Sequence, residues 1–265
     1  MDLKIKYGTT ALIAGASEGI GAAFSEALAR NGFDLVLIAR RSEQLERFAG
    51  ELEERYGIKT ECIALDLSDE DASEKLKVTL AGREIDVLIY NAALSHIGPF
   101  IENDPDEHLK MARVNMITLL NLVYFFGSRM VVRRRGAIIL ITSLAGFQGS
   151  GYLSVYAATK AFSRILAESL WYEWKTKNVD VIACCAGATS TPGYIKSNPG
   201  NPGIFAPRVL RPAEVSAECL RMLGRKPSFI AGRGNRIASF FMQKVFQRKM
   251  AVTIMSNATK KLYRL

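Results

Sequence analysis

The chain has 265 residues, of which 49% are hydrophobic and 23% charged; this composition is ordinary for a globular protein, and the length suits one large α/β domain. The net charge of +9 comes from the end of the chain, because eleven Lys or Arg residues and no Asp or Glu follow Cys219. The preceding part has 24 basic and 26 acidic residues, and this balance excludes a basic nucleic-acid-binding surface over the whole body.

The N-terminal sequence leads directly into a strand predicted at about residue 10. It lacks the charged region followed by a long apolar stretch that is typical of a secretory signal, so we expect a cytoplasmic protein. The four Cys residues, at positions 62, 184, 185 and 219, contain no C-x-x-C pair. They predict neither a disulfide framework nor a metal site.

Six apolar stretches of strand length alternate with helical patterns along most of the chain. Their uninterrupted Val, Ile and Leu content is typical of strands buried on both faces of a parallel sheet. The sequence therefore predicts a doubly wound α/β sheet of the Rossmann type, with its ligand site at the carboxyl ends of the strands. The predicted strands cover residues 10–15, 34–40, 61–67, 86–93, 136–143 and 179–187.

The first predicted strand leads into a glycine-rich turn, which is followed by a helical pattern. Gly15, Gly19 and Gly21 are spaced G-x-x-x-G-x-G. Glycine permits a tight turn and a close approach of the backbone, and the start of the helix offers free N–H groups to a pyrophosphate. The residues expected to contact a dinucleotide here are Gly15, Ser17, Glu18, Gly19, Ile20 and Gly21.

Two arginines follow the second predicted strand. A dinucleotide fold that prefers NAD(H) often has an acidic residue at this place, whereas Arg accommodates the 2′-phosphate of NADP(H). The chain has Arg40 and Arg41 there, and Ser17 can add a hydrogen bond to the same phosphate. We infer NADP(H) as the cofactor, with NAD(H) less favoured; the alternative is that two exposed arginines merely flank the start of a helix.

The helix candidate from Met116 to Val132 is the most apolar of the chain. It is short for a membrane span and contains Asn121, Ser128 and Arg129, so a buried or subunit-facing helix is favoured. Further along, the Pro- and Gly-rich stretch 189–212 follows the last predicted strand. We expect it to form a loop over the ligand site.

Tyr156 and Lys160 lie four residues apart in the sequence "SVYAATKAF". If this segment is helical, the two side chains project from one face. A nearby ammonium lowers the pKa of a phenol and makes it a plausible acid or base. The alternative is a helix surface whose Tyr and Lys have no role in chemistry.

These features together resemble the short-chain dehydrogenase/reductase family over about residues 8–232. The matching sequence elements occur in the order of the family: "AGASEGIG", "LDL" with Asp66, "YNAA" with Asn91, "VN" with Asn115, "ITS" with Ser143, "YAATK" with Tyr156 and Lys160, and "AGATST" with Thr191. The resemblance implies an oxidoreductase that transfers a hydride between NADP(H) and a ketone or secondary alcohol.

The resemblance also implies a role for each matching residue. Tyr156 would be the general acid for reduction and the base for oxidation, and Lys160 would lower its pKa and bind the nicotinamide ribose. Ser143 would donate to the substrate oxygen, and Asn115 would hold a water that links Lys160 to solvent. The implied cofactor contacts further along the chain are Asp66, Leu67, Asn91, Ala92, Ala93, Gly187, Thr189 and Thr191, together with Tyr156 and Lys160.

Three positions depart from the pattern of the family. Ala14 replaces the usual Thr before the first glycine. Tyr90-Asn91-Ala92-Ala93 stands where the family has Asn-Asn-Ala-Gly, and "CAG" at 185–187 stands where it has Asn-Pro-Gly. These changes affect hydrogen bonds expected to brace the cofactor loops. The four residues implied in catalysis are all present.

Two functions of other classes remain as alternatives. A cofactor-sensing protein without turnover has no need of the four residues Asn115, Ser143, Tyr156 and Lys160. A sequence-independent nucleic-acid binder would use the basic tail, but the chain lacks a recognition motif and interleaved stacking aromatics. We therefore expect a small-molecule substrate and no nucleic-acid partner.

The resemblance implies a homodimer or homotetramer, assembled through the helix at about 105–131 and the helix that carries Tyr156. We predict one catalytic domain over residues 1–234 and a basic amphipathic helical tail over 235–265. Ile237, Phe240, Phe241, Val245 and Met250 fall on one side of this tail. That side can pack on the same protein, over the substrate site or on another subunit, which we favour, or it can lie on an anionic membrane surface.

Overall fold

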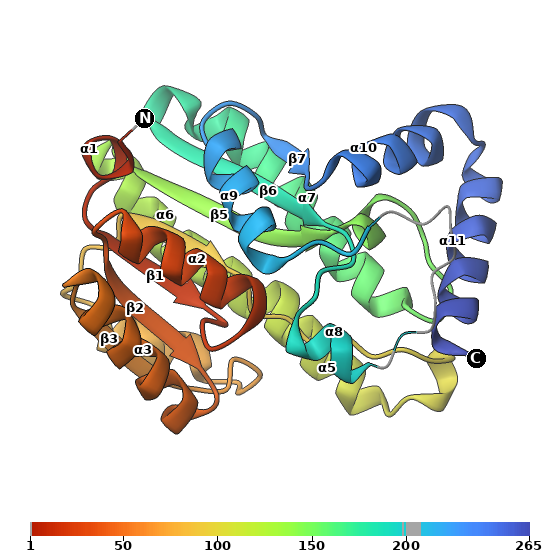
Figure 1. Ribbon diagram of the computed structural model, residues 1–265, viewed down its shortest axis with the longest axis horizontal. Coiled ribbons are helices and arrows are strands. Elements are labelled where there is room, and N and C mark those ends of the chain that lie inside the picture. Colours follow the sequence, from red (N-terminus) through yellow and green to blue (C-terminus); the bar gives the residue numbers. More distant parts are fainter. Residues whose placement is uncertain (1, 198, 200–207) are drawn as a thin grey trace.

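The structure, a computed structural model, describes residues 2–197, 199 and 208–265. In this part of the chain, seven parallel strands form one sheet in the order β3-β2-β1-β4-β5-β6-β7 (Figure 1). The doubly wound sheet predicted from the sequence is confirmed. The strands are β1 Thr10–Ala14, β2 Asp34–Ala39, β3 Thr60–Ala64, β4 Val87–Tyr90, β5 Gly136–Ser143, β6 Val179–Ala186 and β7 Ser228–Ile230.

Successive strand residues point to opposite faces of the sheet and enter two separate cores. Ala11 and Ile13 of β1 pack in a core that includes α1 (Leu3–Tyr7), α2 (Gly19–Arg30), α3 (Ser42–Tyr56) and α9 (Pro212–Met222). Leu12 and Ala14 face the other core, which includes α4 (Ala72–Thr79), α6 (Leu119–Arg133) and α7 (Ser154–Trp174). Helices therefore cover both faces of the sheet (Figure 1), as parallel strands require.

The chain reverses its direction of winding between β1 and β4, which are neighbours in the sheet. At such a point the connections on the two sides diverge and leave a crevice at the carboxyl ends of the strands. The register aligns Ala14 with Tyr90, so the segments that follow β1 and β4 begin side by side. This geometry positions the functional site.

A short helix, α1, precedes β1, so the prediction that the N-terminus leads directly into a strand is wrong. Asp2 caps this helix by accepting from the N–H groups of Lys4 and Ile5. Leu3 and Tyr7 are buried against the first core. The helix has only five residues, which is too short for a periodic apolar pattern.

The long apolar helix spans Pro105–Arg133 and consists of α5 (Pro105–Ala112), a π-helical turn over Arg113–Thr118 and α6. Among the described residues it is the one helix long and apolar enough to cross a membrane, and half of its most apolar window is buried within the protein. It packs on the sheet through residues such as Leu122, Phe126 and Met130. This packing agrees with the expectation of a buried or subunit-facing helix.

The loop predicted over residues 189–212 lies partly outside the described residues, which omit 198 and 200–207. Its described part contains α8 (Pro192–Lys196) and a bridge between Thr189 and Leu210. The remaining short elements are η1 Phe100–Glu102, η3 Leu144–Phe147 and η4 Lys175–Lys177.

The C-terminal tail forms two helices. The first is α10 (Arg233–Phe240), which continues as a π-helical turn over Phe241–Val245, and the second is α11 (Arg248–Tyr263). In Figure 1 these segments lie at one end of the molecule, with α11 outermost. Ile237, Phe240, Phe241, Val245 and Met250 are 46–62% exposed. The expectation that this side packs over the substrate site of its own chain is therefore wrong, while a contact with another subunit stays a prediction.

Candidate active site

A cavity of about 770 Å³ lies at the carboxyl ends of β1, β4, β5 and β6. It brings together residues that are far apart in the sequence, from Gly15 after β1 to Gly187 after β6. All the residues predicted to form the site line it except Gly21 and Asn115, which lie directly behind its wall. The sequence prediction and the geometry therefore converge on one place.

The glycine-rich turn forms one end of this cavity. Gly15 and Gly19 have φ angles of +80° and +61°, which are accessible to glycine and strained for other residues. A Cβ atom on Gly15 would lie 2.8 Å from the nitrogen of Ala92, and one on Gly21 would overlap the carbonyl oxygen of Gly15. The turn therefore depends on glycine at these positions.

The start of α2 is open to a ligand. Glu18 precedes the helix, and its side chain caps none of the N–H groups of the first turn. Ser17, Glu18, Gly19 and Ile20 line the cavity at this point. Free N–H groups at a helix start attract an anion such as a phosphate.

Asn91 braces the glycine-rich turn from the neighbouring strand. Its Nδ2 donates to the carbonyl oxygen of Gly15 over 2.8 Å, while the backbone N–H groups of Asn91 and Ala92 donate to Ala14. Asn91, Ala92 and Ala93 all line the cavity. Despite the substitutions at positions 14 and 90, the two loops are therefore joined by three hydrogen bonds.

The two arginines expected to select the cofactor lie together at the edge of the cavity. An Nη2 of Arg41 lies 2.6 Å from Oε2 of Glu18, and Nη1 of Arg40 lies 4.0 Å from Oδ2 of Asp66. Both guanidinium groups are more than half exposed. A phosphate can therefore reach them, in competition with the carboxylate of Glu18.

Asp66 and Leu67 follow β3 and form the next part of the wall. Oδ1 of Asp66 accepts from both the backbone N–H and the hydroxyl of Ser68, over 2.9 and 2.8 Å. The carbonyl of Leu67 accepts from Thr118 over 3.0 Å. These bonds fix the orientation of Asp66 through Oδ1, while its Oδ2 lies beside Arg40.

Tyr156 and Lys160 lie on α7, one turn apart, and both line the cavity. Nζ of Lys160 donates to the carbonyl oxygen of Ile141 over 2.9 Å and lies 5.7 Å from the centre of the Tyr156 ring. Gly146 allows this part of α7 to approach the sheet, because a Cβ atom there would lie 2.8 Å from the Lys160 backbone. The predicted pair is therefore formed.

Ser143 is the last residue of β5 and lies beside Tyr156. Its Oγ accepts from the N–H of Ala145 over 3.2 Å, which fixes the oxygen and leaves the hydroxyl hydrogen free to donate. The Ser143 hydroxyl is therefore prepared to act as a donor toward the cavity.

Burial controls the titration of both groups on α7. It lowers the pKa of Lys160 from 10.5 to about 8. Burial also raises the pKa of Tyr156. Hydrogen bonding to Ser143 lowers this pKa, and the nearby Tyr263 raises it further. The lowered Tyr156 pKa that the sequence predicts is not found, because burial of the phenol outweighs the effect of its neighbours.

Asn115 occupies the π-helical turn between α5 and α6 and is only 2% exposed. Its amide exchanges two hydrogen bonds of 2.9 Å with the backbone of Leu94, and Nδ2 also donates to Thr159 over 3.0 Å. Thr159 in turn donates to the carbonyl of Tyr156. The side chain therefore joins the loop after β4 to the turn of α7 that carries Tyr156 and Lys160.

Tyr90 supports the same region, a role that the sequence did not indicate. Its buried hydroxyl donates to the carbonyl of Val114 over 2.6 Å, next to Asn115. Burial raises the pKa of this phenol, so it stays protonated and remains a donor. The departure from the family pattern at position 90 thus supplies a new brace.

Gly187, Thr189 and Thr191 line the cavity after β6. Thr189 is buried and donates to the carbonyl of Gly187 over 3.0 Å, while Thr191 caps α8 by accepting from the N–H of Tyr194 over 3.2 Å. The methyl group of Thr191 also faces Gly19. This segment therefore closes the cavity opposite the glycine-rich turn.

The far end of the cavity is formed by α11, which contributes residues that sequence reasoning did not identify. Ser256 accepts from the N–H of Gly151 over 2.8 Å, and Thr259 lies 3.0 Å from the hydroxyl of Ser150. These contacts attach the helix to the segment that precedes α7. The residues of α11 that line the cavity are Met255, Ala258, Thr259, Leu262 and Tyr263.

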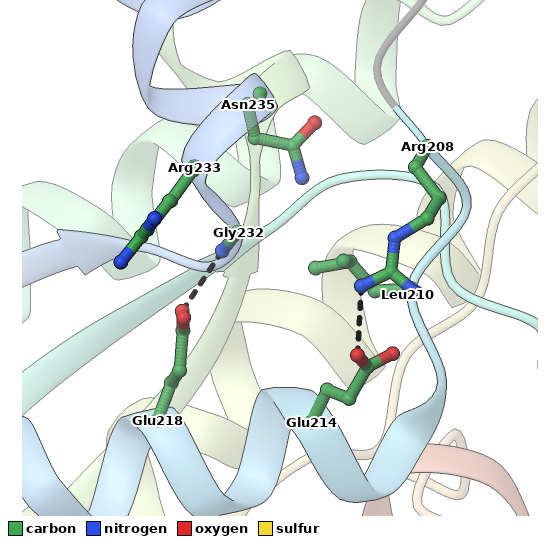
Figure 2. A pocket seen from close by; sticks show the side chains of 8 residues that line it. Arg208, Leu210, Glu214, Glu218, Gly232, Arg233 and Asn235 are labelled. Carbon is green, nitrogen blue, oxygen red and sulfur yellow. Dashed lines mark hydrogen bonds and ion pairs between the residues drawn. The ribbon is translucent and has the colours of Figure 1, made fainter.

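A second cavity of about 310 Å³ lies between α9 and the start of α10 (Figure 2). Its carboxylates are already engaged: Glu214 pairs with Arg208 over 2.7 Å, and Glu218 accepts from the N–H of Gly232 over 2.8 Å. This cavity contains none of the residues predicted for chemistry. We therefore place the active site in the larger cavity.

Comparisons with known proteins agree with this geometry. The family model described as "short chain dehydrogenase" matches residues 9–201. A 7beta-hydroxysteroid dehydrogenase from Clostridium sardiniense is 35% identical over 236 residues, which cover 89% of this chain and 90% of the relative.

Two solved structures extend the comparison. One comes from work on the stereoselectivity of 7beta-hydroxysteroid dehydrogenase and has a TM-score of 0.90 at 31% sequence identity. The aligned region covers 96% of this chain and 99% of the chain in that structure. The other is a short-chain dehydrogenase from Sphingobium yanoikuyae in complex with NADPH, with a TM-score of 0.76 at 29% identity. Here the aligned region covers 84% of this chain and 87% of the chain in that structure.

The buried ammonium of Lys160 makes a prediction about stability. Because folding lowers its pKa to about 8, the unfolded chain binds more protons above that pH, and stability should rise with pH. Between about pH 8 and about pH 9.5, the unmodified protein should gain up to about 2 kcal/mol relative to Lys160→Met. Urea unfolding of both proteins across this range measures the difference, and parallel stability curves would show that the ammonium is not destabilised by burial.

Proposed function

The chain belongs to the short-chain dehydrogenase/reductase family of oxidoreductases, which use a nicotinamide cofactor. From this premise we propose that it transfers a hydride between NADP(H) and a bulky ketone or secondary alcohol. The observation that carries the proposal is the convergence of Ser143, Tyr156 and Lys160 in one cavity with the glycine-rich turn. A cytoplasmic location is part of the proposal.

The residues of the cavity fit a dinucleotide. Gly15 and Gly21 permit the tight turn, because a Cβ atom on either would collide with the backbone of Ala92 or Gly15, and the uncapped start of α2 offers N–H groups for a pyrophosphate. Arg40 and Arg41 lie at the same end, where they would hold a 2′-phosphate. Asp66 would accept from the adenine amine through its Oδ2, which the bonds to Ser68 do not use. Lys160 lies at the opposite end, where it would bind the ribose next to the nicotinamide.

The bound cofactor supplies or accepts the hydride, and the protein controls the charge on the substrate oxygen. When a carbonyl carbon gains a hydride, its oxygen becomes negative and must be stabilised and protonated. Ser143 donates a hydrogen bond to that oxygen, and Tyr156 donates its proton. In the oxidation direction Tyr156 takes up the proton of the alcohol.

Lys160 supports this proton transfer without contacting the substrate. Its ammonium lies beneath Tyr156 and stabilises the phenolate that remains after the proton has left. Asn115 acts as a positioning residue, because both hydrogens of its amide are used by Leu94 and Thr159. A water that links Lys160 to solvent would therefore be held by the remaining lone pair of Oδ1 or by the main chain of this turn.

The substrate end of the cavity favours a large apolar molecule. Leu94, Ile97, Leu153, Met255 and Leu262 line it, with Tyr194 and Tyr263 as polar groups. Apolar walls with a few polar groups are typical of sites for rigid hydrophobic ligands. A hydroxysteroid or its ketone fits this lining, and the relatives named for 7beta-hydroxysteroid dehydrogenase support the choice.

Removing the proton donor tests the mechanism. Tyr156→Phe should lower kcat for ketone reduction by at least about a hundredfold and leave the affinity for NADPH within about twofold, because only the phenol oxygen is lost. Lys160→Ala should weaken both turnover and cofactor binding. Tyr56→Phe, whose hydroxyl bonds Glu26 on the surface, is the matched control.

The measurements are steady-state turnover with a 7-oxosteroid and fluorescence titration with NADPH. Substantial turnover by Tyr156→Phe would show that another group donates the proton. Binding of NADPH without turnover by the unmodified protein, across a panel of bulky ketones, would instead favour the cofactor-sensing alternative.

Replacing Arg41 or Arg40 tests the choice of cofactor. Arg41→Ala and Arg40→Asp should each weaken NADPH binding by about tenfold to a hundredfold, since a hydrogen bond to a charged group contributes about 1.5–3 kcal/mol. Binding of NADH, which lacks the 2′-phosphate, should change little. Arg47→Asp on the exposed surface of α3 is the control, and equal affinity of the unmodified protein for the two cofactors would overturn the assignment.

Exposed apolar side chains on the long helix and α7 support a homodimer or homotetramer. Those on the long helix are Leu109, Ile117, Leu120 and Tyr124, and those on α7 are Ile165 and Tyr172, all between 43% and 77% exposed. A continuous apolar surface of this kind is typical of a subunit interface.

Light scattering of the unmodified protein at micromolar concentration should give at least twice the chain mass of 29.2 kDa. Tyr124→Glu should shift the mass toward a monomer, because the charge would be buried without a partner. An exposed Val78→Glu on α4 serves as the control. A monodisperse monomer of the unmodified protein would rule out this assembly.

A further inference from the structure

The segment formed by α10 and its π-helical turn exposes large apolar side chains and buries two uncharged polar ones. Asn235 and Ser239, four residues apart, are 3% and 6% exposed. Ile237, Phe240, Phe241 and Val245 are exposed by 62%, 58%, 46% and 55%. We call these four side chains the C-terminal ledge. A helix that only covered the body of a protein would have the opposite orientation.

Contacts at the start of α10 hold this orientation in place. Glu218 of α9 accepts from the N–H of Gly232 over 2.8 Å (Figure 2). It also pairs with Arg236 over 3.3 Å. Nδ2 of Asn235 donates to the carbonyl of Ala231 over 2.8 Å. Rotation of the helix to bury the ledge would separate Arg236 from Glu218 and expose the buried Asn235, so these contacts oppose it.

Basic side chains surround the ledge. Arg233, Arg236 and Lys244 lie on the same segment, and Arg248 and Lys249 follow it; all five are exposed. Of these, Arg236 is paired with a carboxylate, that of Glu218 on α9, and the sequence after Cys219 contains no acidic residue. The ledge therefore combines large apolar side chains with a positive rim.

We propose that the C-terminal ledge binds the surface of an anionic lipid bilayer. Phe240, Phe241 and their apolar neighbours would enter the boundary between head groups and acyl chains, while Lys244 and the arginines would face the anionic head groups. A second copy of this chain fits less well, because a twofold contact between two ledges would place like charges against each other.

Vesicle sedimentation with the full chain tests the proposal. The protein should pellet with vesicles of phosphatidylglycerol and phosphatidylcholine at low salt and remain in solution with phosphatidylcholine alone. High salt should weaken the binding, because the head groups attract the basic rim over a distance that salt screens. Phe240→Ser/Phe241→Ser and Lys244→Glu/Lys249→Glu should each reduce the partition coefficient by at least about tenfold.

Two matched controls separate the ledge from general surface effects. Val78→Ser/Ile101→Ser removes exposed apolar side chains elsewhere, and Arg47→Glu/Lys59→Glu reverses the same number of charges on a distant surface. Both should bind the anionic vesicles as the unmodified protein does. Turnover in solution should be unchanged in all four double variants, which makes the result independent of the proposed reaction.

Three outcomes would overturn the proposal. The unmodified protein could fail to pellet with anionic vesicles, or the ledge variants could bind as well as their controls. Alternatively, without vesicles, light scattering could show a smaller assembly for Phe240→Ser/Phe241→Ser than for Val78→Ser/Ile101→Ser. The last outcome would assign the ledge to a second copy of this chain.

Discussion

The hydrogen bond from Lys160 to the carbonyl of Ile141 is the contact on which the arrangement of the site depends. A buried ammonium needs a strong acceptor, and this one is supplied by the end of β5. The bond joins α7 to the sheet at the level of Ser143, so Tyr156, one turn earlier, faces the same serine. Gly146 permits this close approach, and Thr142 strengthens it by donating to the carbonyl of Lys160 over 2.7 Å.

Residues without a direct chemical role extend this arrangement to the cofactor end of the cavity. Asn115 ties α7 to the loop after β4, Tyr90 holds the π-helical turn that carries Asn115, and Asn91 connects the same strand end to Gly15. A continuous series of hydrogen bonds thus runs from the glycine-rich turn to Tyr156. In physical terms, the phosphate end and the proton-donating end of the cavity are held at a fixed separation, as hydride transfer requires.

Local sequence patterns were sufficient for the doubly wound sheet and for the glycine-rich turn, because strands buried on both faces and a Gly-rich strand-to-helix turn have strong signals. Most other residues of the cavity wall were predicted from the motifs that the chain shares with its family. They failed where the cause was tertiary. The three residues of β7 and the five of α1 are too short for periodicity. The bond of Tyr90 to Val114 and the place of Tyr263 in the cavity depend on elements distant in sequence. For the tail, amphipathicity was recognised but the buried side was not, because Glu218 sets the rotation of α10.

The most direct test of the central claim is to follow the transferred hydrogen itself. NADPH carrying deuterium at the transferable C4 position would be incubated with the protein and a 7-oxosteroid, and the alcohol product analysed by mass spectrometry and NMR. The account predicts one deuterium on the new carbinol carbon, with the hydroxyl proton taken from solvent. A product without deuterium at that carbon would contradict hydride transfer in this cavity.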